Sequence, residues 1–586
     1  MPALILTVIL LFSLPAAAQP AAEESWVARS DRNAQVLLEV LARFNPEGAG
    51  FMGIDGLERE ILQLPPDRNL RRVEALEAAI AELESRLDVE TDARVKLDLE
   101  ILIGSARFNV RRIRLTEDVL LPYVDLPQTV FQGIRALLDE QVSAEDRAAA
   151  EVRLRRYTGA EDGYRPLTEQ AEALVRSRLG RSELEGPYIN ELERNLGNTQ
   201  RYLDGIRDLL ASFEIAGCDE YVDALERQLA VSDDFLRAEV LPRARRDARL
   251  PPAVYEMLLE EMGVDMPVDE LARRGMVAFR EIQNEMRVLA GLIAEERQLA
   301  DADYRDVLRH LRRDQLSGES ILEVYTARID QLERLIEEHD VVTLPSRKMR
   351  IRLATEAESA AIPSPFMRPP RLIGNTGEMG EFVLPFRVPA TQEGESSQVP
   401  DYTFEAASWT LAVHEGRPGH ELQFSSMIEN GVSLTRSIFA FNYVNVEGWA
   451  LYCEAEMKPT FPLDGQLVSL QHRLLRAARA FLDPGMQSGA ISEAEALRLL
   501  EHDVVLSPSL ARQEIDRYTF LDPAQAVSYF AGYLRLMELR AEVEQKLGDD
   551  FDRRAFHDLI LAQGLLPPRL LRRTVLEELG LSATSG

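Results

Sequence analysis

The sequence predicts a mainly α-helical protein with one small β segment near residues 380–390. Through most of the chain, apolar residues recur three and four positions apart with charged residues between them. This pattern is typical of helices that bury one face. Prolines interrupt it between about Ile362 and Pro400 and exclude a continuous helix there. We find no fixed-period repeat, so a helical solenoid is not expected.

The length of 586 residues is too great for one compact core. It predicts two to four domains, or one large helical body with subdomains. We expect a helical amino-terminal part over residues 19–345 and a second part over residues 346–586, divided where the proline-rich segment approaches. The composition is that of a globular protein, with 46% hydrophobic and 28% charged residues.

The charge balance is strongly acidic. The chain has 98 Asp and Glu residues against 67 Lys and Arg residues, which gives a formal net charge of -31. Nucleic acid is therefore not expected as a partner, because binding to phosphates needs a basic face. Anionic membrane surfaces are disfavoured for the same reason, and the sequence leaves the oligomeric state open.

The first residues, 1–18, resemble a signal peptide. The apolar run Leu4–Leu14 is followed by proline and three alanines, which predicts cleavage after Ala18 and export to the periplasm or the medium. The run is too short to span a bilayer, and no later stretch is long enough. The two cysteines, Cys218 and Cys453, lie far from this cleavage site, so we expect no lipid anchor. Whether they pair with each other stays open, although burial as a small apolar residue is favoured for Cys453.

Two apolar stripes and one short strand represent the elements that we expect. The stripes predict helices that pack one face onto a core. They consist of Val73, Leu76, Ile80, Leu83 and Leu87 in one helix and of Leu322, Tyr325, Ile329, Leu332 and Ile336 in the other. Within the proline-rich segment, Phe382–Val388 is typical of a strand. Because proline cannot donate to a sheet, Pro385 predicts that this strand lies at a sheet edge.

The segment over residues 409–423 carries the most chemical information. His414 and Glu415 match the start of the zincin motif, in which two histidines one helical turn apart bind zinc and the glutamate beside the first activates water. Here the second histidine, His420, follows after six residues instead of four. On a straight helix this spacing leaves the two rings about 120° apart, so they would not share a metal.

Pro418 and Gly419 can correct that geometry. Proline breaks the helical hydrogen-bond ladder, and glycine adopts backbone angles that other residues avoid. We therefore expect a kink or a two-residue bulge that turns His420 back towards His414. The alternative is a helix that stops at Arg417, with Pro-Gly as its end signal and two unrelated histidines.

Glu447 is the best candidate for a third ligand. A catalytic zinc site needs three protein ligands and an open position for water. Glu447 lies far enough from His420 for a turn and a returning helix, and it shares a helix face with Glu454 seven residues on. A solvated helix carboxylate is the alternative for either glutamate. Nitrogen and carboxylate ligands favour a single Zn²⁺, while manganese, cobalt and iron remain open.

Two segments carry a resemblance to a known family. They are His414-Glu415-x-x-Pro418-Gly419-His420-x-x-Gln423 and Glu447-Gly448-Trp449-Ala450-Leu451-Tyr452. Both are similar to the family described as domain of unknown function 885. Later blocks at residues 514–518, 523–529 and 556–558 also look like those of the family, and the resemblance should cover nearly the whole mature chain.

This family looks like a branch of the gluzincin metallopeptidases, which are relatives of thimet oligopeptidase and angiotensin-converting enzyme. Dipeptidyl peptidase III offers a parallel, with one residue inserted between its ligand histidines. The resemblance implies a large helical gluzincin-like architecture with a deep cleft, one Zn²⁺ and a peptide substrate. By the same analogy, residues 346–586 form the zinc-binding catalytic part. The amino-terminal part walls the cleft and limits entry to short or unfolded peptides.

The chain departs from the family pattern at two positions. Many members have a second histidine directly after the one that matches His420, whereas this chain has Glu421. We take His420 as the ligand because the family pattern itself requires that position. A later block commonly begins Pro-Gly-Gln, whereas here it is Pro523-Ala524-Gln525. Loss of that glycine affects a turn and removes no functional group.

The expected mechanism is hydrolysis by a metal-activated water. Zinc is held by His414, His420 and Glu447, and Glu415 takes the proton of the water and passes it to the leaving amine.

This mechanism also needs residues that stabilise the oxyanion and orient the ligand histidines. By resemblance to gluzincins with a downstream tyrosine or histidine, Tyr529 is the first candidate and Tyr518 the second for stabilising the oxyanion. Buried core tyrosines are the alternative for both. Ligand histidines usually donate their other ring N–H to a carboxylate, for which Glu454 and Asp516 are candidates.

The remaining histidines are not expected as metal ligands. His557 stays a candidate for the site, although a core or helix-start position is favoured, and four others lie in charged helical stretches and are expected on the surface. These four are His310, His339, His472 and His502.

The strand at Phe382–Val388 is a candidate edge for an extended peptide, which would then lie beside the zinc helix. Two rival functions stay open. One is a zinc-dependent hydrolase or lyase that acts on a non-peptide amide or another small molecule. The other is a non-catalytic helical binding protein with a decayed site. Glu415 argues against decay, because metal binding alone does not need it.

Overall fold

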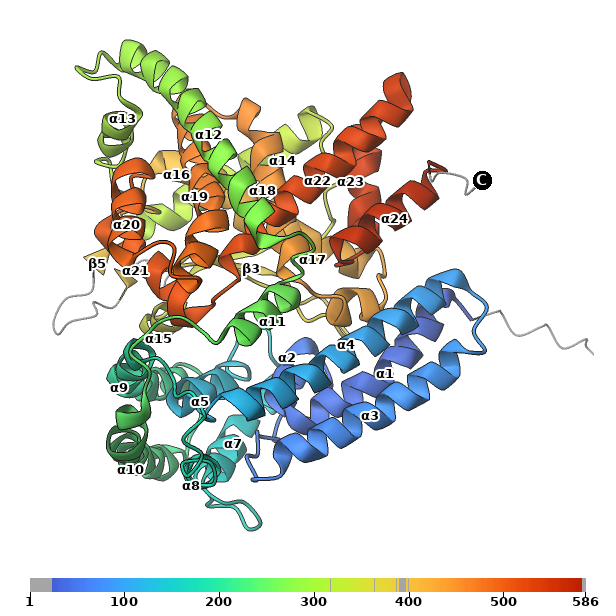
Figure 1. The fold of residues 1–586 in the computed structure, drawn as a ribbon, viewed down its shortest axis with the longest axis vertical. Helices are drawn as coiled ribbons and strands as arrows, with labels where there is room; N and C mark the ends of the chain where they lie inside the picture. Colours follow the sequence, from blue (N-terminus) through green and yellow to red (C-terminus); the bar gives the residue numbers. More distant parts are fainter. Residues whose placement is uncertain are drawn as a thin grey trace, which may run out of the picture.

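The computed structural model describes residues 24–316, 318–362, 364–385, 387–388, 397–398 and 400–581, and it is mainly helical (Figure 1). The predicted signal peptide lies outside the described residues, as do Pro363, Phe386 and Pro389 of the proline-rich segment. The mainly α fold class is thus confirmed, together with a small sheet.

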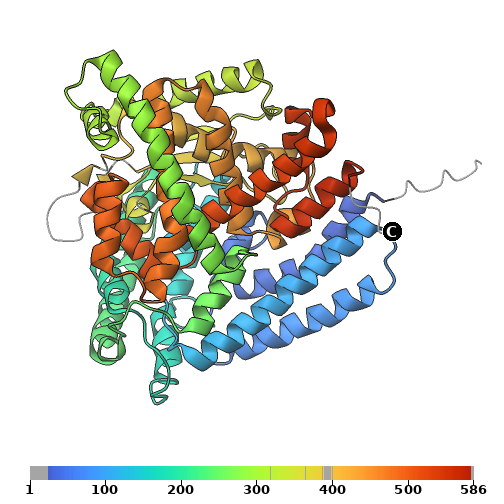
Figure 2. The same ribbon diagram turned by 45° about the horizontal axis from the view of Figure 1, so that its top comes forward.

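Helices α1–α10 form the part drawn in blue to teal in Figure 1. Their bounds are α1 Trp26–Phe44, α2 Pro46–Met52, α3 Arg68–Leu87, α4 Ala93–Val119, α5 Leu126–Arg135, α6 Ala144–Arg147, α7 Ala149–Tyr157, α8 Leu167–Arg176, α9 Ile189–Ser212 and α10 Asp219–Phe235. Helices α1, α3 and α4 pack side by side, as both views show (Figures 1 and 2). The predicted stripe of α3 buries Val73, Leu76 and Leu83 between them, which confirms it.

The largest hydrophobic core lies in the other part and takes in helices on both sides of the boundary expected at residue 345. These helices are α11 Pro252–Met262, α12 Val268–Arg297, α13 Tyr304–Leu311, α14 Gly318–Glu338, α16 Glu405–Leu411, α17 His420–Glu429, α18 Tyr443–Met457, α19 Leu463–Gln487, α20 Glu493–Arg498, α21 Pro508–Asp516, α22 Ala526–Leu547, α23 Arg553–Ala562 and α24 Pro568–Glu578. The predicted stripe of α14 is confirmed, because Tyr325, Leu332 and Ile336 are fully buried.

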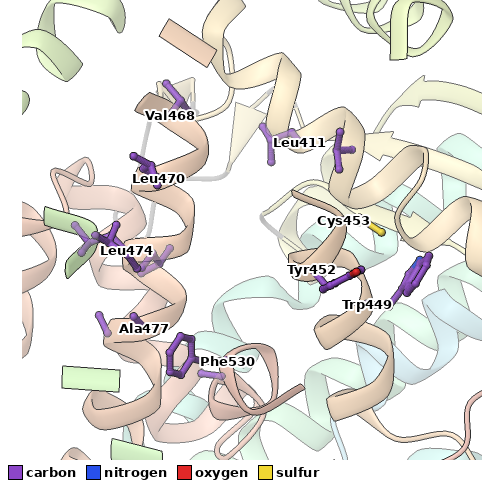
Figure 3. Close-up of a cluster of buried hydrophobic side chains, with 14 of the residues drawn as sticks. Leu411, Trp449, Tyr452, Cys453, Val468, Leu470, Leu474, Ala477 and Phe530 are labelled. Carbon is purple, nitrogen blue, oxygen red and sulfur yellow. The ribbon is translucent and has the colours of Figure 1, made fainter. Parts of the chain in front are cut away.

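The centre of this core is α19, and α12 packs along it (Figure 2). Figure 3 shows apolar side chains of α19 in the same cluster as those of α18. They are Val468, Leu470, Leu474 and Ala477 from α19 and Trp449, Tyr452 and Cys453 from α18. The helices α18 and α22 approach most closely at Gly448 and Gly532, where a Cβ on Gly532 would overlap the Val444 carbonyl oxygen. Small residues at this crossing therefore set the spacing of two helices that carry site residues.

A three-stranded sheet has the order β1-β3-β2, formed by β1 Arg350–Leu353, β2 Phe366–Arg368 and β3 Glu381–Leu384. The strand predicted around Phe382 exists, but its expected edge position is wrong. Strand β3 is central, parallel to β1 and antiparallel to β2. It ends at Leu384, so Pro385 follows the last ladder pair instead of interrupting it. A second pair, β4 Arg387–Val388 with β5 Ser397–Gln398, and a short helix α15 at Glu356–Ala361 complete this region.

Both cysteines are buried and free, and they lie in separate hydrophobic cores. The predicted burial of Cys453 is confirmed, and no Cys218–Cys453 bridge is formed in the structure. Among the described residues, no helix has the length and apolar character needed to cross a membrane.

Candidate metal centre

The helix that carries His414 ends where the sequence places Pro418 and Gly419. After α16 the backbone forms one π-helical turn at Ala412–Gly416, and Arg417 is extended. A new helix, α17, begins at His420. The predicted break is thus present, as a junction between two helices and not as a bulge within one. Only glycine fits at position 419, because a Cβ there would overlap the carbonyl oxygens of Val413 and His414.

Helix α18 holds this junction in place. The indole nitrogen of Trp449 donates to the Pro418 carbonyl oxygen at 2.9 Å, and the Cys453 thiol contacts the same oxygen at 3.5 Å. The same helix carries Glu447 and Glu454. One helix therefore fixes the bend between the two histidines and also supplies the carboxylates that face them.

The three predicted ligands converge on one point. Glu447 Oε2 lies 3.4 Å from His414 Nε2 and 3.4 Å from His420 Nε2, and the three ligand atoms all lie within 4.8 Å of one another. Zinc bonds of about 2.0–2.2 Å in tetrahedral geometry place neighbouring ligand atoms roughly 3.3–3.5 Å apart. All three side chains are buried, and Glu447 Oε2 has no hydrogen-bond partner among the described residues. An unpaired carboxylate oxygen in this position is costly without a cation, so the donor set fits a divalent metal.

Hydrogen bonds to neighbouring side chains orient two of the three candidate ligands, His414 and Glu447. His414 Nδ1 lies 2.7 Å from Glu454 Oε1, the arrangement of a ring N–H that donates to a carboxylate. The amide nitrogen of Gln525 donates to Glu447 Oε1 at 3.1 Å. Of the two predicted partners for a ligand histidine, the structure brings Glu454 to the site and leaves Asp516 off the cavity wall. His420 Nδ1 has no such partner within the part of the chain that the structure describes.

The negative charge of Glu454 is stabilised by Arg476 as well as by His414. Burial alone would raise the pKa of Glu454, but the nearby Arg476 guanidinium and the hydrogen bond from His414 outweigh burial and lower that pKa to about 2. Glu454 is therefore ionised at neutral pH and favours the N–H of His414 at Nδ1. That tautomer leaves the Nε2 lone pair free for a metal.

Glu415 lines the same cavity as the ligands and is almost completely buried. Burial raises the pKa of its carboxyl, against the lowering effect of the two neighbouring histidines. A carboxylate with this raised pKa beside a metal position has the character of a general base.

The two tyrosines predicted to stabilise the oxyanion differ in their position relative to the cavity. Tyr529 lies on the cavity wall with its ring stacked on His414 at a centroid distance of 6.0 Å. Its hydroxyl accepts hydrogen bonds from Arg517 at 3.3 Å and Gln525 at 3.4 Å. Tyr518 is fully buried, donates its hydroxyl to Glu514 at 2.7 Å and does not line the cavity.

The cavity has a volume of about 580 Å³, within the range of small-ligand sites. The amino-terminal part contributes to its wall through Gln128 of α5 and Arg194, Asn195, Asn198 and Tyr202 of α9. Strand β2 contributes Phe366 and Met367 on another side. The site therefore lies between the two parts of the chain.

Sequence reasoning missed several residues of this wall. The prediction of a surface position for His472 is wrong. His472 is buried, because α12, α16, α18 and α22 pack around α19 and its remaining face lines the cavity. Arg476 Nη1 lies 3.0 Å from His472 Nδ1. Burial and the Arg476 charge lower the pKa of His472 to about 3. Arg479 and Gln525 also reach the cavity. The available signal was the spacing of His472, Arg476 and Arg479, which places all three on one face of a helix.

The other histidines follow the predictions more closely. His557 is buried in the core, where Nε2 lies 2.7 Å from the Tyr452 hydroxyl and Nδ1 lies 2.7 Å from the Val341 carbonyl oxygen. His339 and His502 are exposed, and His310 is half-buried.

A family model described as "Bacterial protein of unknown function (DUF885)" matches residues 46–575. The chain belongs to this family. Two solved structures have the same fold. One is a candidate lipoprotein of unknown function from Shewanella oneidensis, with 18% identity, a TM-score of 0.68 and coverage of 94% of this chain and 100% of that one. The other is a candidate lipoprotein from Colwellia psychrerythraea, with 17% identity, a TM-score of 0.73 and coverage of 95% and 100%. A comparison with curated proteins finds no match.

Both departures from the DUF885 pattern have a structural explanation. Glu421 points away from the candidate metal position and is fully buried, where it accepts from Arg417 Nε at 2.7 Å and from the Ser425 hydroxyl at 2.7 Å. It is thus the partner of an arginine at the helix junction. Ala524 has a φ of 70°, the left-handed region that favours glycine. Ala524 thus adopts a backbone angle that suits the glycine expected here from the family pattern.

Proposed function

We propose that this DUF885 protein is an exported, zinc-dependent metallopeptidase of the gluzincin type that hydrolyses short or unfolded peptides. The observation that carries the proposal is the convergence of His414 Nε2, His420 Nε2 and Glu447 Oε2 on one point at the wall of a cavity, with Glu415 beside them. A glutamate next to the first ligand histidine has no role in holding the metal. Its presence on the cavity wall favours catalysis over storage of an ion.

The role of each residue in hydrolysis follows from this geometry. Zinc at this position would polarise the scissile carbonyl and acidify a water molecule. Glu415 accepts the proton of the attacking water as the new C–O bond forms. It then returns the proton to the amide nitrogen as the C–N bond breaks. The Tyr529 hydroxyl, held by Arg517 and Gln525, is placed to donate to the oxygen that becomes negatively charged.

The peptide itself needs a surface along which to extend. Strand β3 is paired on both sides, so the strand edge expected there is not free. Strand β2 is the outer strand of the sheet, packs beside the π-helical turn that carries His414, and supplies Phe366 and Met367 to the cavity wall. We therefore place an extended substrate along the outer edge of β2, where backbone hydrogen bonds would hold any sequence.

Export is part of the proposal. The amino-terminal sequence has the features of a signal peptide, and the two structurally similar proteins are described as candidate lipoproteins. The first cysteine of this chain is Cys218, so the sequence near the predicted cleavage site supplies no thiol for a lipid. We expect the mature protein in the periplasm or the medium.

The decisive experiment compares three proteins: the wild type, Glu415→Gln and the matched control Glu501→Gln, which changes an exposed glutamate. Metal content is measured after dialysis, and cleavage of a peptide mixture is followed by mass spectrometry. All three should bind one zinc ion per chain. Glu415→Gln should cleave about 10²–10⁴-fold more slowly, the usual contribution of a general base.

Two results would reject the proposal. One is cleavage by Glu415→Gln at the wild-type rate. The other is a metal-loaded wild type that leaves every peptide intact while it hydrolyses small amides, which would make the protein a hydrolase of another class.

A further inference from the structure

Arginines gather at the candidate site although the chain as a whole carries a formal charge of -31. Four line the cavity and come from three elements: Arg194 from α9, Arg476 and Arg479 from α19, and Arg517 from the π-helical turn at Arg517–Leu521. No lysine is among the described residues of this wall. Because the guanidinium group pairs with carboxylates in a fixed two-pronged geometry, this choice of cation favours an anionic ligand.

Two of these arginines are already engaged. Arg479 donates to both oxygens of Glu514, at 2.8 Å and 2.6 Å. Arg476 contacts His472 at 3.0 Å and lies 3.8 Å from Glu454. Both are buried. They neutralise carboxylates behind the wall and leave little capacity for a substrate.

Arg517 differs from them. Its Nη1 donates to Gln525 Oε1 at 2.9 Å and to the Tyr529 hydroxyl at 3.3 Å, both neutral acceptors. Its closest ion pair is with Glu514 Oε1 at 4.0 Å, an oxygen that Arg479 already holds. Its side chain keeps 22% of its surface exposed. Arg517 thus presents a positive charge to the cavity without a close carboxylate of its own.

Asp522 is the other acidic group that faces Arg517. It lies on the same wall, and burial raises its pKa to about 6 against the lowering effect of the Arg517 charge. The structure records no ion pair between them within 4.0 Å. Asp522 therefore leaves the outer nitrogens of Arg517 available to a ligand.

The position of Arg517 relative to the ligands limits what that ligand is. Gln525 bridges the two: its oxygen accepts from Arg517 Nη1 and its nitrogen donates to Glu447 Oε1. One glutamine side chain thus separates the Arg517 guanidinium from the carboxylate of Glu447, a candidate metal ligand. An extended peptide advances about 3.3–3.6 Å per residue, so one or two residues span the gap between the scissile bond and Arg517.

We infer that Arg517 binds the free α-carboxylate at the carboxyl terminus of the substrate, so that the enzyme removes one or two residues from that end. The inference rests on the proposed function and adds its substrate class. An Asp or Glu side chain carries the same chemical group and would fit the same guanidinium. The α-carboxylate is favoured because the buried Arg479–Glu514 ion pair lies beside Arg517 on the same cavity wall, where a continuing chain would have to displace it.

The test uses two peptides of one sequence, a free acid and its carboxyl-terminal amide, and a third peptide amide in which the last residue is replaced by Asp. Values of kcat/KM are measured with zinc-loaded wild type, Arg517→Gln, Arg517→Lys and the matched control Arg498→Gln, which changes an exposed arginine. The wild type and the control should prefer the free acid over the plain amide about 10- to 100-fold, the usual effect of losing one charged hydrogen bond. Mass spectrometry should show loss of one or two terminal residues.

In Arg517→Gln the ratio of acid to amide should fall towards one, mainly through KM, and Arg517→Lys should restore part of it. A ratio that Arg517→Gln leaves unchanged would overturn the inference and reduce Arg517 to a support for Tyr529. If Arg517→Gln does not fold, calorimetry with zinc-loaded Glu415→Gln decides instead: it should bind the free acid at least 10-fold more tightly than the amide.

Three further outcomes distinguish a failure of this inference from a failure of the function on which it rests. Equal cleavage of acid and amide at interior bonds by wild type would overturn carboxylate binding and leave a peptidase. A preference for the Asp amide would assign Arg517 to acidic side chains and likewise overturn the terminal assignment. Absence of any cleavage by zinc-loaded wild type would reject the peptidase itself.

Discussion

His414 makes use of both ring nitrogens. Nε2 faces Glu447 and His420, and Nδ1 faces Glu454 at 2.7 Å. Glu454 is in turn placed by the Thr410 hydroxyl and the Arg476 charge. A chain of buried polar contacts therefore fixes the ring before any ion arrives, which is the condition for tight and selective metal binding.

We predict that Glu454→Gln binds zinc about 10- to 100-fold more weakly than wild type, the usual effect of losing a carboxylate behind a ligand histidine. Glutamine keeps the size of the side chain and loses the charge that favours the metal-competent tautomer. Competition with a chromophoric chelator measures the affinity. Asp516→Asn is the matched control, because it makes the same kind of change off the cavity wall. Equal affinity in Glu454→Gln and wild type would contradict the prediction.

The positions of single site residues could be predicted from the sequence where their spacing along a helix alone places them on one face. Glu447 and Glu454 are seven residues apart, so any helix places them on one face, and both face His414. Arg517 and Gln525 could not be assigned in this way. They reach the site through the π-helical turn at Arg517–Leu521 and the left-handed Ala524, and neither feature follows from hydrophobic periodicity.

The junction between α16 and α17 decides whether the site exists. Its backbone passes so close to the preceding turn that residue 419 has no room for a side chain. Trp449 and Cys453 then anchor the junction at the Pro418 carbonyl oxygen. The distance between His414 and His420 thus depends on one glycine and one anchoring helix.

We predict that Gly419→Ala loses most of its zinc affinity and unfolds at lower denaturant concentration than wild type. The added methyl group overlaps two carbonyl oxygens, so the junction must shift and separate the two rings. Overpacking of this kind typically costs about 1–3 kcal/mol. Gly104→Ala is the matched control: it lies within helix α4 with nothing near its Cβ position, and it should stabilise by about 0.5–1 kcal/mol. Metal content and urea denaturation measure both variants, and an unchanged zinc affinity in Gly419→Ala would refute this account of the junction.

The sheet shows what the sequence leaves open at the scale of elements. The strand itself was visible from its apolar residues, but its neighbours were not. β1 and β2 lie about 30 and 15 residues before β3 in the chain, and neither has the alternating pattern that would reveal a partner. Pro385 suggested an edge strand, whereas β3 simply stops one residue earlier.

The two parts of the molecule are joined by a buried ion pair that lies outside the lining of the candidate metal cavity. Asp98 of α4 is fully buried and accepts from Arg436 Nε at 2.8 Å, with the hydroxyls of Ser30 and Ser433 on its other oxygen. Arg436 also donates to Gln563, the residue that follows α23, at 2.9 Å. The segment of Arg436 leads directly into α18, which carries Glu447. The amino-terminal helices therefore brace the start of the helix on which the site depends.

We predict that Arg436→Leu lowers the free energy of unfolding by about 3–5 kcal/mol, because it leaves the Asp98 carboxylate buried without a counter-charge. Asp98→Asn combined with Arg436→Leu should be less destabilised than Arg436→Leu alone, since no charge then remains in the interior. Arg111→Leu is the matched control: it breaks an exposed pair with Glu260 that also links α4 to a later helix, and it should cost less than about 1 kcal/mol. Urea denaturation of the wild type and the three variants gives the comparison. A loss in Arg436→Leu no larger than that in Arg111→Leu would mean that the two parts are held together by their apolar contacts alone, and the bracing of α18 through Asp98 would have to be abandoned.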